Sequence, residues 1–214
     1  MIQLEQVSKS FNGRRLFSGI NHEVRAGEIL VLVGASGVGK SSLLRIVAGL
    51  LAFHGKVLIN GVEIRGEDPK PTAYTAYVGQ PPGLWQHLTA LENVALVRRL
   101  LFREARQQAR VVSRELLEEL DVVSVADRFP ATLSGGEQQR VGLARGLAAD
   151  RPVLLLDEVT SNVDSKRRLT VVGAVKAELA KGKCGVFATH DLETARLLTD
   201  VPYTLDESGL TPLR

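Results

Sequence analysis

Cysteine is almost absent from the 214-residue sequence, and aromatic residues make up only 5% of it. Because Cys184 is the single cysteine, no disulfide can form within the chain. A reducing compartment is therefore expected, and the class of small disulfide-stabilised secreted domains is excluded. Cys184 lies in the apolar stretch "KCGVFATH", so we expect it to be a small core residue.

The sequence also lacks long hydrophobic runs. The longest, "EILVLVG" and "PVLLLDE", fall well short of the roughly 20 apolar residues that a membrane-spanning helix needs. Residues 1–11 show no positively charged leader followed by an apolar core, so no export signal is expected. These absences predict a chain that is soluble by itself and lies in the cytoplasm.

Blocks of like charge are missing too. The formal net charge is +3, from 27 Lys and Arg against 24 Asp and Glu. A basic excess can indicate nucleic acid or an anionic membrane as partner, but here the basic residues are interleaved with acids, as in "REARQQARVVSRELLEEL". This pattern favours solvated helix faces, and we expect no nucleic-acid partner.

The first third of the chain alternates short apolar stretches with turn signals. These stretches are "IQLEQVS", "HEV", "EILVLV" and "KVLIN", the last closed by Asn60-Gly61. Such spacing is typical of strands joined by tight turns. It predicts an antiparallel β portion around one buried central strand.

Residues 89–120 change character, because their apolar side chains recur at helical spacing between many charges. The apolar positions are Leu91, Val94, Leu96, Val97, Val112, Leu116, Leu117 and Leu120. Strands and helices then alternate: "PVLLLD", a helix over 165–180, "CGVFATH" and a helix over 192–198. This alternation predicts a parallel sheet covered on both faces.

The expected fold is therefore α/β, with a parallel sheet, an N-terminal antiparallel β subdomain and a helical insertion. We find neither internal repeats nor low-complexity linkers. The chain is predicted to be one domain over 1–214, with a core of about 1–80 and 150–214 and a helical subdomain of about 81–149.

A phosphate-binding loop is indicated by "GASGVGKS", Gly34 to Ser41, which follows a predicted strand and precedes the apolar helix "SSLLRIVAGL". Glycines in such a loop let successive backbone N–H groups point into one concavity, and the helix start adds its positive dipole end. Lys40 can reach the outer phosphates, and the Ser41 hydroxyl can bind Mg²⁺. The candidate ligand-binding residues of the loop are Gly34, Ser36, Gly37, Val38, Gly39, Lys40, Ser41 and, as polar support, Ser42.

Two carboxylates follow the apolar strand "VLLL" in "VLLLDE". Asp157 at the strand end is predicted to hold Mg²⁺. Glu158 would face the terminal phosphate and act as general base on an attacking water. Read alone, the pair could equally be a helix cap or a solvated corner, and it is the phosphate loop that favours the catalytic interpretation.

Three motifs occur in a fixed order, "GASGVGKS", "LSGGEQQR" and "VLLLDE". Together they resemble the nucleotide-binding subunit of ATP-binding cassette (ABC) transporters, and the resemblance covers essentially the whole chain. It implies a P-loop NTPase core, ATP and Mg²⁺ as cofactors, and ATP hydrolysis.

The resemblance also implies a use for the two glycines in "LSGGEQQR". In this family two subunits stack head to tail, and the signature motif of one covers the phosphates held by the other. Ser134 is a good helix N-cap, and Gly135 and Gly136 would present backbone N–H groups at a helix start. The implied partner is a second ABC ATPase subunit, in a homodimer or a heterodimer.

Four further positions match the family. Gln80 resembles the glutamine that senses Mg²⁺ and the attacking water, and His190 resembles the switch histidine that contacts the terminal phosphate. Asp164 resembles the acid of the loop that crosses the dimer interface. Phe11 stands where an aromatic ring stacks on adenine, although an aromatic residue there could also be core.

The chain departs from the family where many members read "DEPTSALD". It reads "DEVTSNVD", with Val159 in place of the proline and Asn162 in place of the alanine. Asp157, Glu158 and Asp164 remain, so the resemblance still implies hydrolysis. It does not fix the geometry of the interface loop, where the two departures lie.

Without a membrane span of its own, the chain would drive transport through an integral membrane permease, at the inner face of the cell membrane. The family receives this partner near Gln80 and "PPGLWQHLTALENV". Leu84, Trp85 and Leu88 are either the apolar anchor of that surface or core residues.

The transported substrate is not determined by the sequence. "LWQHLTALENVAL" is similar to the corresponding region of bacterial polar-amino-acid importers, while lipoprotein-release and cell-division ATPases fit the chain as well. A soluble cassette acting on DNA or ribosomes is disfavoured, since the insertion has no sustained heptads and the chain has one cassette. A non-hydrolytic scaffold conflicts with Glu158 and His190.

Overall fold

The computed structural model describes residues 1–64 and 73–213, and the chain divides into two compact units. The first comprises Met1–Tyr77, Arg151–Glu158 and Glu178–Arg214, and the second Val78–Asp150 and Val159–Ala177. The sequence pattern predicts residues 159–177 to be part of the core, whereas the structure groups them with the helices of the second unit.

The first unit contains two sheets. One has the order β2-β1-β4-β5 and the other β10-β9-β3-β8-β7-β6. The first sheet consists of β1 (Ile2–Phe11), β2 (Arg14–Val24), β4 (His54–Ile59) and β5 (Val62–Ile64). The second consists of β3 (Ile29–Val33), β6 (Thr75–Val78), β7 (Val153–Asp157), β8 (Cys184–Thr189), β9 (Tyr203–Asp206) and β10 (Gly209–Pro212).

Burial explains the central strands of the second sheet. Every residue of β7 and β8 is buried, as expected for strands covered on both faces. β3 pairs in parallel with β8, and β7 pairs in parallel with the other edge of β8, which confirms the predicted parallel sheet. Cys184 is 1% exposed, so its predicted place in the core is also confirmed.

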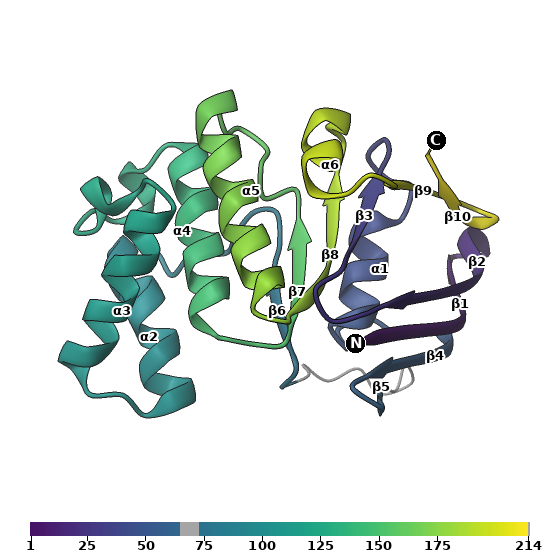
Figure 1. The fold of residues 1–214 in the computed structure, drawn as a ribbon, viewed down its shortest axis with the longest axis horizontal. Helices are drawn as coiled ribbons and strands as arrows, with labels where there is room; N and C mark the ends of the chain where they lie inside the picture. The colour runs from purple at the N-terminus through teal and green to yellow at the C-terminus, as the bar shows by residue number, and fades with distance from the viewer. Residues whose placement is uncertain (65–72, 214) are drawn as a thin grey trace. The chain divides into compact units, whose positions relative to one another are not determined.

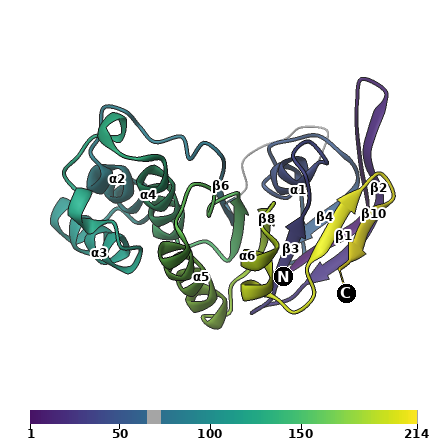
Figure 2. The same cartoon turned by 90° about the horizontal axis from the view of Figure 1, so that it is seen from above.

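The first sheet is antiparallel throughout its recorded pairs, β1 with β2, β1 with β4 and β4 with β5, as the turn signals predicted. The antiparallel pair β9 and β10 was not predicted, because its two four-residue strands carry little hydrophobic patterning. Figure 2 shows β10 beside β2, with which it is in contact.

Two helices cover the strands of the first unit (Figure 1). α1 (Lys40–Val47) packs against β7 and β8, and α6 (Leu192–Leu198) packs against β3 and β8. The buried face of α1 includes Leu43, Leu44, Ile46 and Val47. These side chains join one hydrophobic cluster with both sheets, so the start of α1 is held firmly at the end of β3.

The second unit is helical. α2 (Ala90–Phe102), α3 (Arg106–Glu119) and α4 (Gly135–Ala148) pack against one another, as Figure 2 shows, and α5 (Ser165–Ala180) begins in this unit. The predicted insertion over residues 89–120 is thus two helices, separated at Arg103 with φ 55°. The predicted bounds of α5 and α6 are confirmed.

Asn93 fixes the segment that leads into α2. Its side chain is fully buried and accepts a hydrogen bond from Trp85 N at 2.8 Å, while its amide donates to Trp85 O, Leu88 O and Thr89 O. Within this segment Leu84 is 7% exposed and Trp85 is 37% exposed. Leu84 is therefore core, and Trp85 remains available at the surface.

Within the described residues, no helix is both long enough and apolar enough to cross a bilayer.

Two glycines offer a matched test of this packing. A Cβ on Gly185 of β8 would lie 2.6 Å from the Leu154 carbonyl oxygen, whereas one on exposed Gly173 of α5 would meet nothing within 4 Å. We expect Gly185→Ala to lower the free energy of unfolding by about 1–3 kcal/mol through overpacking. Gly173→Ala should raise it by about 0.5–1 kcal/mol, since alanine favours a helix interior.

Urea unfolding followed by circular dichroism measures both changes. Equal effects of the two substitutions would contradict the close approach of β8 to β7 at Gly185.

Candidate functional site

The loop between β3 and α1 depends on Gly39, the N-cap residue of α1. Gly39 has φ 109°, a conformation that residues with a Cβ rarely adopt. A Cβ there would also lie 3.1 Å from Cδ1 of Phe17 in β2. The glycine therefore lets the chain turn sharply into the helix while β2 packs beside it, so that the helix start faces the loop of residues 34–39.

Lys40 carries a positive charge at this helix start. Its Nζ donates hydrogen bonds to Gly34 O at 2.6 Å and Ala35 O at 3.0 Å, and its side chain is only 6% exposed. The loop carbonyls compensate the loss of hydration that burial of an ammonium group costs. The ammonium group is thereby fixed over the loop, where it can attract phosphate oxygens.

Asp157, at the end of β7, is 3% exposed and held from both sides. Ser41 Oγ donates to Asp157 Oδ1 at 3.0 Å, and the Tyr77 hydroxyl donates to Asp157 Oδ2 at 3.2 Å. Arg45 Nε in turn donates to the Tyr77 oxygen at 3.5 Å. The structure thus places a serine hydroxyl and a carboxylate side by side, which are oxygen donors of the kind that bind Mg²⁺.

Burial, more than any other factor, raises the pKa of the Tyr77 hydroxyl. The neighbouring Asp157 carboxylate raises this pKa further, while Arg45 lowers it. Tyr77 is consequently protonated at neutral pH and acts as a donor to Asp157. The sequence does not reveal the roles of Tyr77 and Arg45, because an aromatic residue in a strand and an arginine on a helix carry no local signal of this contact.

Glu158 follows Asp157 directly and takes a backbone φ of 54°, which is uncommon for a residue other than glycine. Its N–H donates to Ala188 O at 3.0 Å. Its Oε2 lies 2.8 Å from His190 Nδ1, and its Oε1 lies 4.0 Å from Lys40 Nζ. The carboxylate therefore stands between a lysine and a histidine, in reach of the same loop.

Phe11 ends β1 with its side chain 46% exposed, so it is not a core residue. Lys9 Nζ lies 4.6 Å from the centroid of its ring, within the range of a cation–π interaction. One face of the Phe11 ring is thus engaged by a cation, and the exposed ring offers a surface for stacking.

Ser134 is the N-cap residue of α4, as predicted, and it forms a capping box with Glu137. Ser134 N donates to Glu137 Oε2 at 2.7 Å, and Glu137 N donates to Ser134 Oγ at 3.3 Å. The hydrogen bond from Ser134 N is the largest cause that lowers the pKa of Glu137. Reciprocal capping of this kind satisfies two of the free N–H groups at the helix start.

The two glycines of the motif differ in their surroundings. Gly135 is exposed, whereas Gly136 is buried. A Cβ on Gly136 would lie 2.6 Å from Asn162 O, while one on Gly135 would lie 3.8 Å from Asn162 Cβ. Gly136 is therefore the more closely packed of the two, and its missing side chain makes room for residue 162. That both glycines present backbone N–H groups to a partner's phosphates stays a prediction.

Asn162 is one of the two family departures noted in the sequence. It takes φ 60°, a conformation that asparagine tolerates better than most residues with a side chain. Val159, the other departure, is fully buried. Both substitutions therefore fit the local structure of the segment that follows Glu158.

Asp164 is exposed and caps the start of α5. Its Oδ1 accepts from Arg167 N at 3.0 Å, and its Oδ2 accepts from the Arg167 guanidinium at 2.7 Å. The first of these hydrogen bonds is the largest cause that lowers the pKa of Asp164. Arg167 also bonds Asp121 at 3.2 Å, so this carboxylate is tied to its own unit.

Gln80 follows β6 and precedes a cis peptide bond to Pro81. Its Nε2 donates to Ser161 Oγ at 2.9 Å, three residues beyond Glu158. No sequence pattern predicts a role for Ser161, because nothing in the sequence shows that it meets Gln80.

The predicted site residues thus fall into two groups. The first unit brings together the side chains of Lys40, Ser41, Asp157, Glu158 and His190, and it also holds Phe11, Ser36, Gly37, Val38 and Ser42. The second unit holds Gln80, Ser134, Gly135, Gly136 and Asp164.

Comparison with known proteins places these groups in context. The model of the family described as "ABC transporter" matches residues 17–161. The glutamine transport ATP-binding protein GlnQ of Bacillus subtilis (strain 168) is 34% identical, with alignment over 98% of this chain and 88% of GlnQ. A probable amino-acid ABC transporter ATP-binding protein of Haemophilus influenzae is 33% identical, over 94% of this chain and 82% of that protein.

Relatives with other named substrates are equally similar. The sulfate/thiosulfate import ATP-binding protein CysA of Pseudomonas syringae pv. tomato is 35% identical over 93% of this chain, but the chain spans only 62% of CysA. Among solved structures, the dimeric post-hydrolysis state of the ATP-binding cassette MJ0796 bound to ADP and Pi has a TM-score of 0.88 and 29% identity. The match covers 100% of this chain and 99% of that one.

The two glycines of α4 give a testable difference. We expect Gly136→Ala to lower the free energy of unfolding by about 1–3 kcal/mol, because its Cβ would overlap a backbone oxygen. Gly135→Ala should leave it unchanged or slightly raise it, by less than about 1 kcal/mol. Chemical denaturation measures both, and hydrogen exchange of residues 159–164 reports whether the Asn162 segment loosens in Gly136→Ala alone. Equal stability of the two variants would refute the packing of Asn162 on Gly136.

Proposed function

Since the chain belongs to the ABC transporter family and is an ABC ATPase, we propose that it is the ATP-hydrolysing subunit of a membrane transporter. In this proposal it binds Mg-ATP at residues 34–41, closes as a dimer on the nucleotide and drives a separate integral membrane permease. The observation that carries the proposal is the position of Glu158 between Lys40 and His190, at 4.0 Å and 2.8 Å.

The residues present fit Mg-ATP. Lys40 holds an ammonium group over the loop at a helix start, which suits a triphosphate. Ser41 and Asp157 supply adjacent oxygen donors. Among the described residues, no group of three or more His, Cys, Asp or Glu side chains could hold a metal ion alone. Mg²⁺ is usually bound by one or two carboxylates together with substrate phosphates, and Asp157 beside Ser41 supplies donors of this kind.

In the proposed mechanism, Lys40 and the N–H groups of the loop hold the phosphates in line with the attacking water. Glu158 orients this water and accepts its proton while the water oxygen bonds to the γ-phosphorus. The bond from that phosphorus to the β–γ bridging oxygen breaks, which gives ADP and phosphate. When bound, Mg²⁺ supplies positive charge that neutralises the phosphate oxygens. His190 keeps the Glu158 carboxylate in place and lies in reach of the terminal phosphate.

The remaining predicted residues act at the same nucleotides. Phe11 stacks on adenine, and Gln80 responds to Mg²⁺ and the attacking water. Ser134, Gly135 and Gly136 of one subunit face the phosphates bound by the other subunit, with Asp164 in the loop at the interface. Support comes from the dimeric ATP-binding cassette MJ0796, a second structure of which matches with a TM-score of 0.89 and 31% identity.

For the transported substrate we propose a polar amino acid, taken up by import. The support is an identity of 34% to the glutamine transport protein and of 33% to the probable amino-acid protein over nearly the whole chain, together with the similarity of "LWQHLTALENVAL" to the corresponding region of polar-amino-acid importers. The proposal places the chain at the inner face of the cell membrane, held there by its permease.

The assignment of the base is tested by Glu158→Gln. Proton abstraction by a positioned carboxylate contributes roughly 10²–10⁴-fold to a rate, so we expect steady-state ATPase activity to fall by about 10²-fold or more. ATP binding should persist and the closed dimer should accumulate in Mg-ATP, measured by light scattering after size exclusion. Glu119→Gln, at an exposed position of α3, is the control. Unchanged ATPase activity in Glu158→Gln would eliminate Glu158 as the base.

The hydroxyl of Tyr77 gives a second test, on Mg²⁺ binding. Tyr77→Phe removes one hydrogen bond that orients Asp157, worth about 1 kcal/mol. The Mg²⁺ concentration for half-maximal binding of a fluorescent ATP analogue should therefore rise about fivefold, while binding of the analogue without Mg²⁺ stays unchanged. If the variant bound the analogue more weakly both with and without Mg²⁺, the role of Tyr77 would be to stabilise the phosphate loop and not to orient Asp157.

The permease is tested by capture. Tagged Glu158→Gln protein with Mg-ATP should retain a polytopic membrane protein in stoichiometric amount from detergent-solubilised source membranes, identified by mass spectrometry. If the retained partners were soluble proteins, ribosomes or DNA alone, the transport assignment would be withdrawn while the ATPase chemistry stood.

A further inference from the structure

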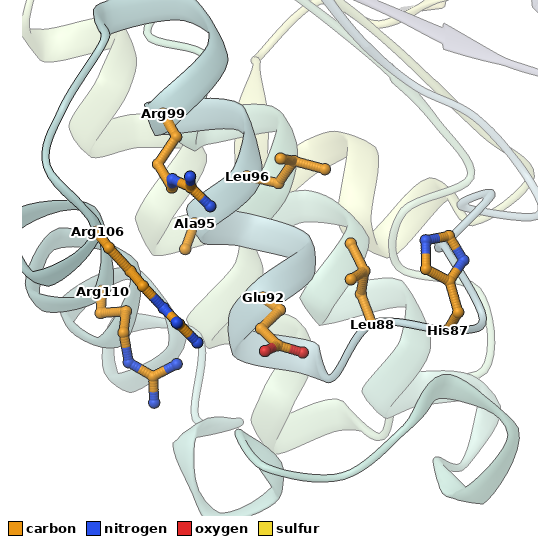
Figure 3. Close-up of a pocket in the computed structure, with 8 residues that line it drawn as sticks. All are labelled: His87, Leu88, Glu92, Ala95, Leu96, Arg99, Arg106 and Arg110. Atoms are coloured by element: carbon orange, nitrogen blue, oxygen red, sulfur yellow. The ribbon is translucent and has the colours of Figure 1, made fainter.

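A pocket of about 180 Å³ opens between α2 and α3 in the second unit (Figure 3). Its apolar wall consists of Leu88, Ala95 and Leu96, of which Ala95 is buried. A pocket for a whole small-molecule ligand usually measures about 300–1,000 Å³. This one therefore suits a single side chain.

Three arginines reach this pocket from two helices. Arg99 comes from α2, and Arg106 and Arg110 come from α3, and Figure 3 shows Arg106 and Arg110 extending side by side. Of the described residues that line the pocket, Glu92 is the one carboxylate. The lining thus has an excess of positive charge.

Glu92 is already engaged at the start of its own helix. Its Oε2 accepts from Thr89 N at 3.0 Å and from Thr89 Oγ1 at 3.1 Å, as part of a capping box. The backbone hydrogen bond is the largest cause that lowers the pKa of Glu92, and the charges of Arg110 and Arg106 lower it further. Glu92 therefore neutralises the three arginines only in part.

The three guanidinium groups make no hydrogen bond or ion pair with any other residue in 1–64 or 73–213. Two other arginines of the same unit do have partners. Arg98 pairs with Glu104, and Arg145 donates to Gly83 O at 2.8 Å. Arg103 and Arg114, which are exposed and lie outside the pocket, also make no such contact within the described residues, so the distinguishing feature of Arg99, Arg106 and Arg110 is that all three line one pocket.

The placement of Arg106 and Arg110 also opposes helix stability. Arg106 is the first residue of α3, whose first turn holds no acidic residue and whose N-cap, Ala105, has no side-chain hydrogen bond. A cation at a helix N-terminus interacts unfavourably with the helix dipole, and like charges four residues apart repel. An anion bound at this place would remove both unfavourable interactions.

We propose that this pocket binds the carboxylate of a glutamate or aspartate in a cytoplasmic segment of the membrane subunit, an inference that rests on the proposed function. The carboxylate lies among Arg99, Arg106 and Arg110, which suit it by charge and by bidentate geometry. The apolar neighbours of that acidic residue contact Leu88 and Leu96. The acidic side chain thus selects the membrane partner and fixes its orientation on α2 and α3.

The experiment uses the complex of the Glu158→Gln chain with the captured membrane subunit, in Mg-ATP and micelles of zwitterionic detergent without added lipid. The test variant, in that background, is Arg106→Gln/Arg110→Gln. The control is Arg103→Gln/Arg114→Gln, which removes the same charge from two exposed arginines outside the lining. The affinity of each for the purified membrane subunit is measured by biolayer interferometry.

We expect the test variant to bind about tenfold more weakly and the control to stay within about twofold of the parent. Because the like-charge repulsion disappears, the thermal unfolding midpoint of the test variant should equal or exceed that of the parent. A lower affinity together with an undiminished unfolding midpoint identifies a binding role, whereas a purely structural role would lower both the affinity and the midpoint.

Charge reversal identifies the partner residue. Arg106→Glu/Arg110→Glu should abolish binding, and a Glu→Lys or Asp→Lys change at one position in a cytoplasmic segment of the membrane subunit should restore it.

The inference is overturned if the test variant binds like the control or if none of these changes restores binding. It is also overturned if the arginines matter only after anionic lipid is added, which would assign the pocket to a lipid headgroup. Failure of the parent chain to capture any membrane protein would instead refute the proposed function.

Discussion

The parallel pairing of β3, β8 and β7 is the constraint on which the nucleotide site depends. Its register sets Val33 opposite Thr189 and Asp157 opposite Ala188, so the residues that follow these strands leave the sheet at one edge. The phosphate loop follows β3, Glu158 follows β7 and His190 follows β8. Three segments that are far apart in the sequence therefore supply one cluster of charges, as is usual at the carboxyl ends of parallel strands.

Charged groups buried at this edge require compensation, and each has it within the same unit. The Lys40 ammonium is bonded by carbonyl oxygens of its own loop, and the Asp157 carboxylate by two hydroxyl groups. Glu158 takes an uncommon positive φ, which costs free energy that the surrounding contacts must offset. Such unfavourable local features, supported by the fold, are typical of sites organised for chemistry rather than for stability.

In the helical unit, one helix start likewise departs from the rules for local helix stability. Both α2 and α4 begin with a capping box, Thr89 with Glu92 and Ser134 with Glu137, and so follow the rules for a stable helix start. The start of α3 breaks those rules with an arginine and no side-chain cap. This uncapped start lies beside the pocket lined by Arg99, Arg106 and Arg110, for which an anionic partner is proposed above.

The sequence alone determined what depends on neighbours along the chain. Apolar runs gave the central strands, and helical spacing gave the insertion that contains α2 and α3. Alternation with strands gave α5 and α6, and three motifs gave the loop, the signature helix and the acidic pair, since each depends on residues a few positions apart. Tertiary structure decided which of Leu84 and Trp85 is buried, that Tyr77 holds Asp157, and that Gly136 is covered by Asn162. The Tyr77 contact joins residues 80 positions apart, and no local pattern encodes such a pairing, because it arises only when packing of the whole unit brings the two side chains together.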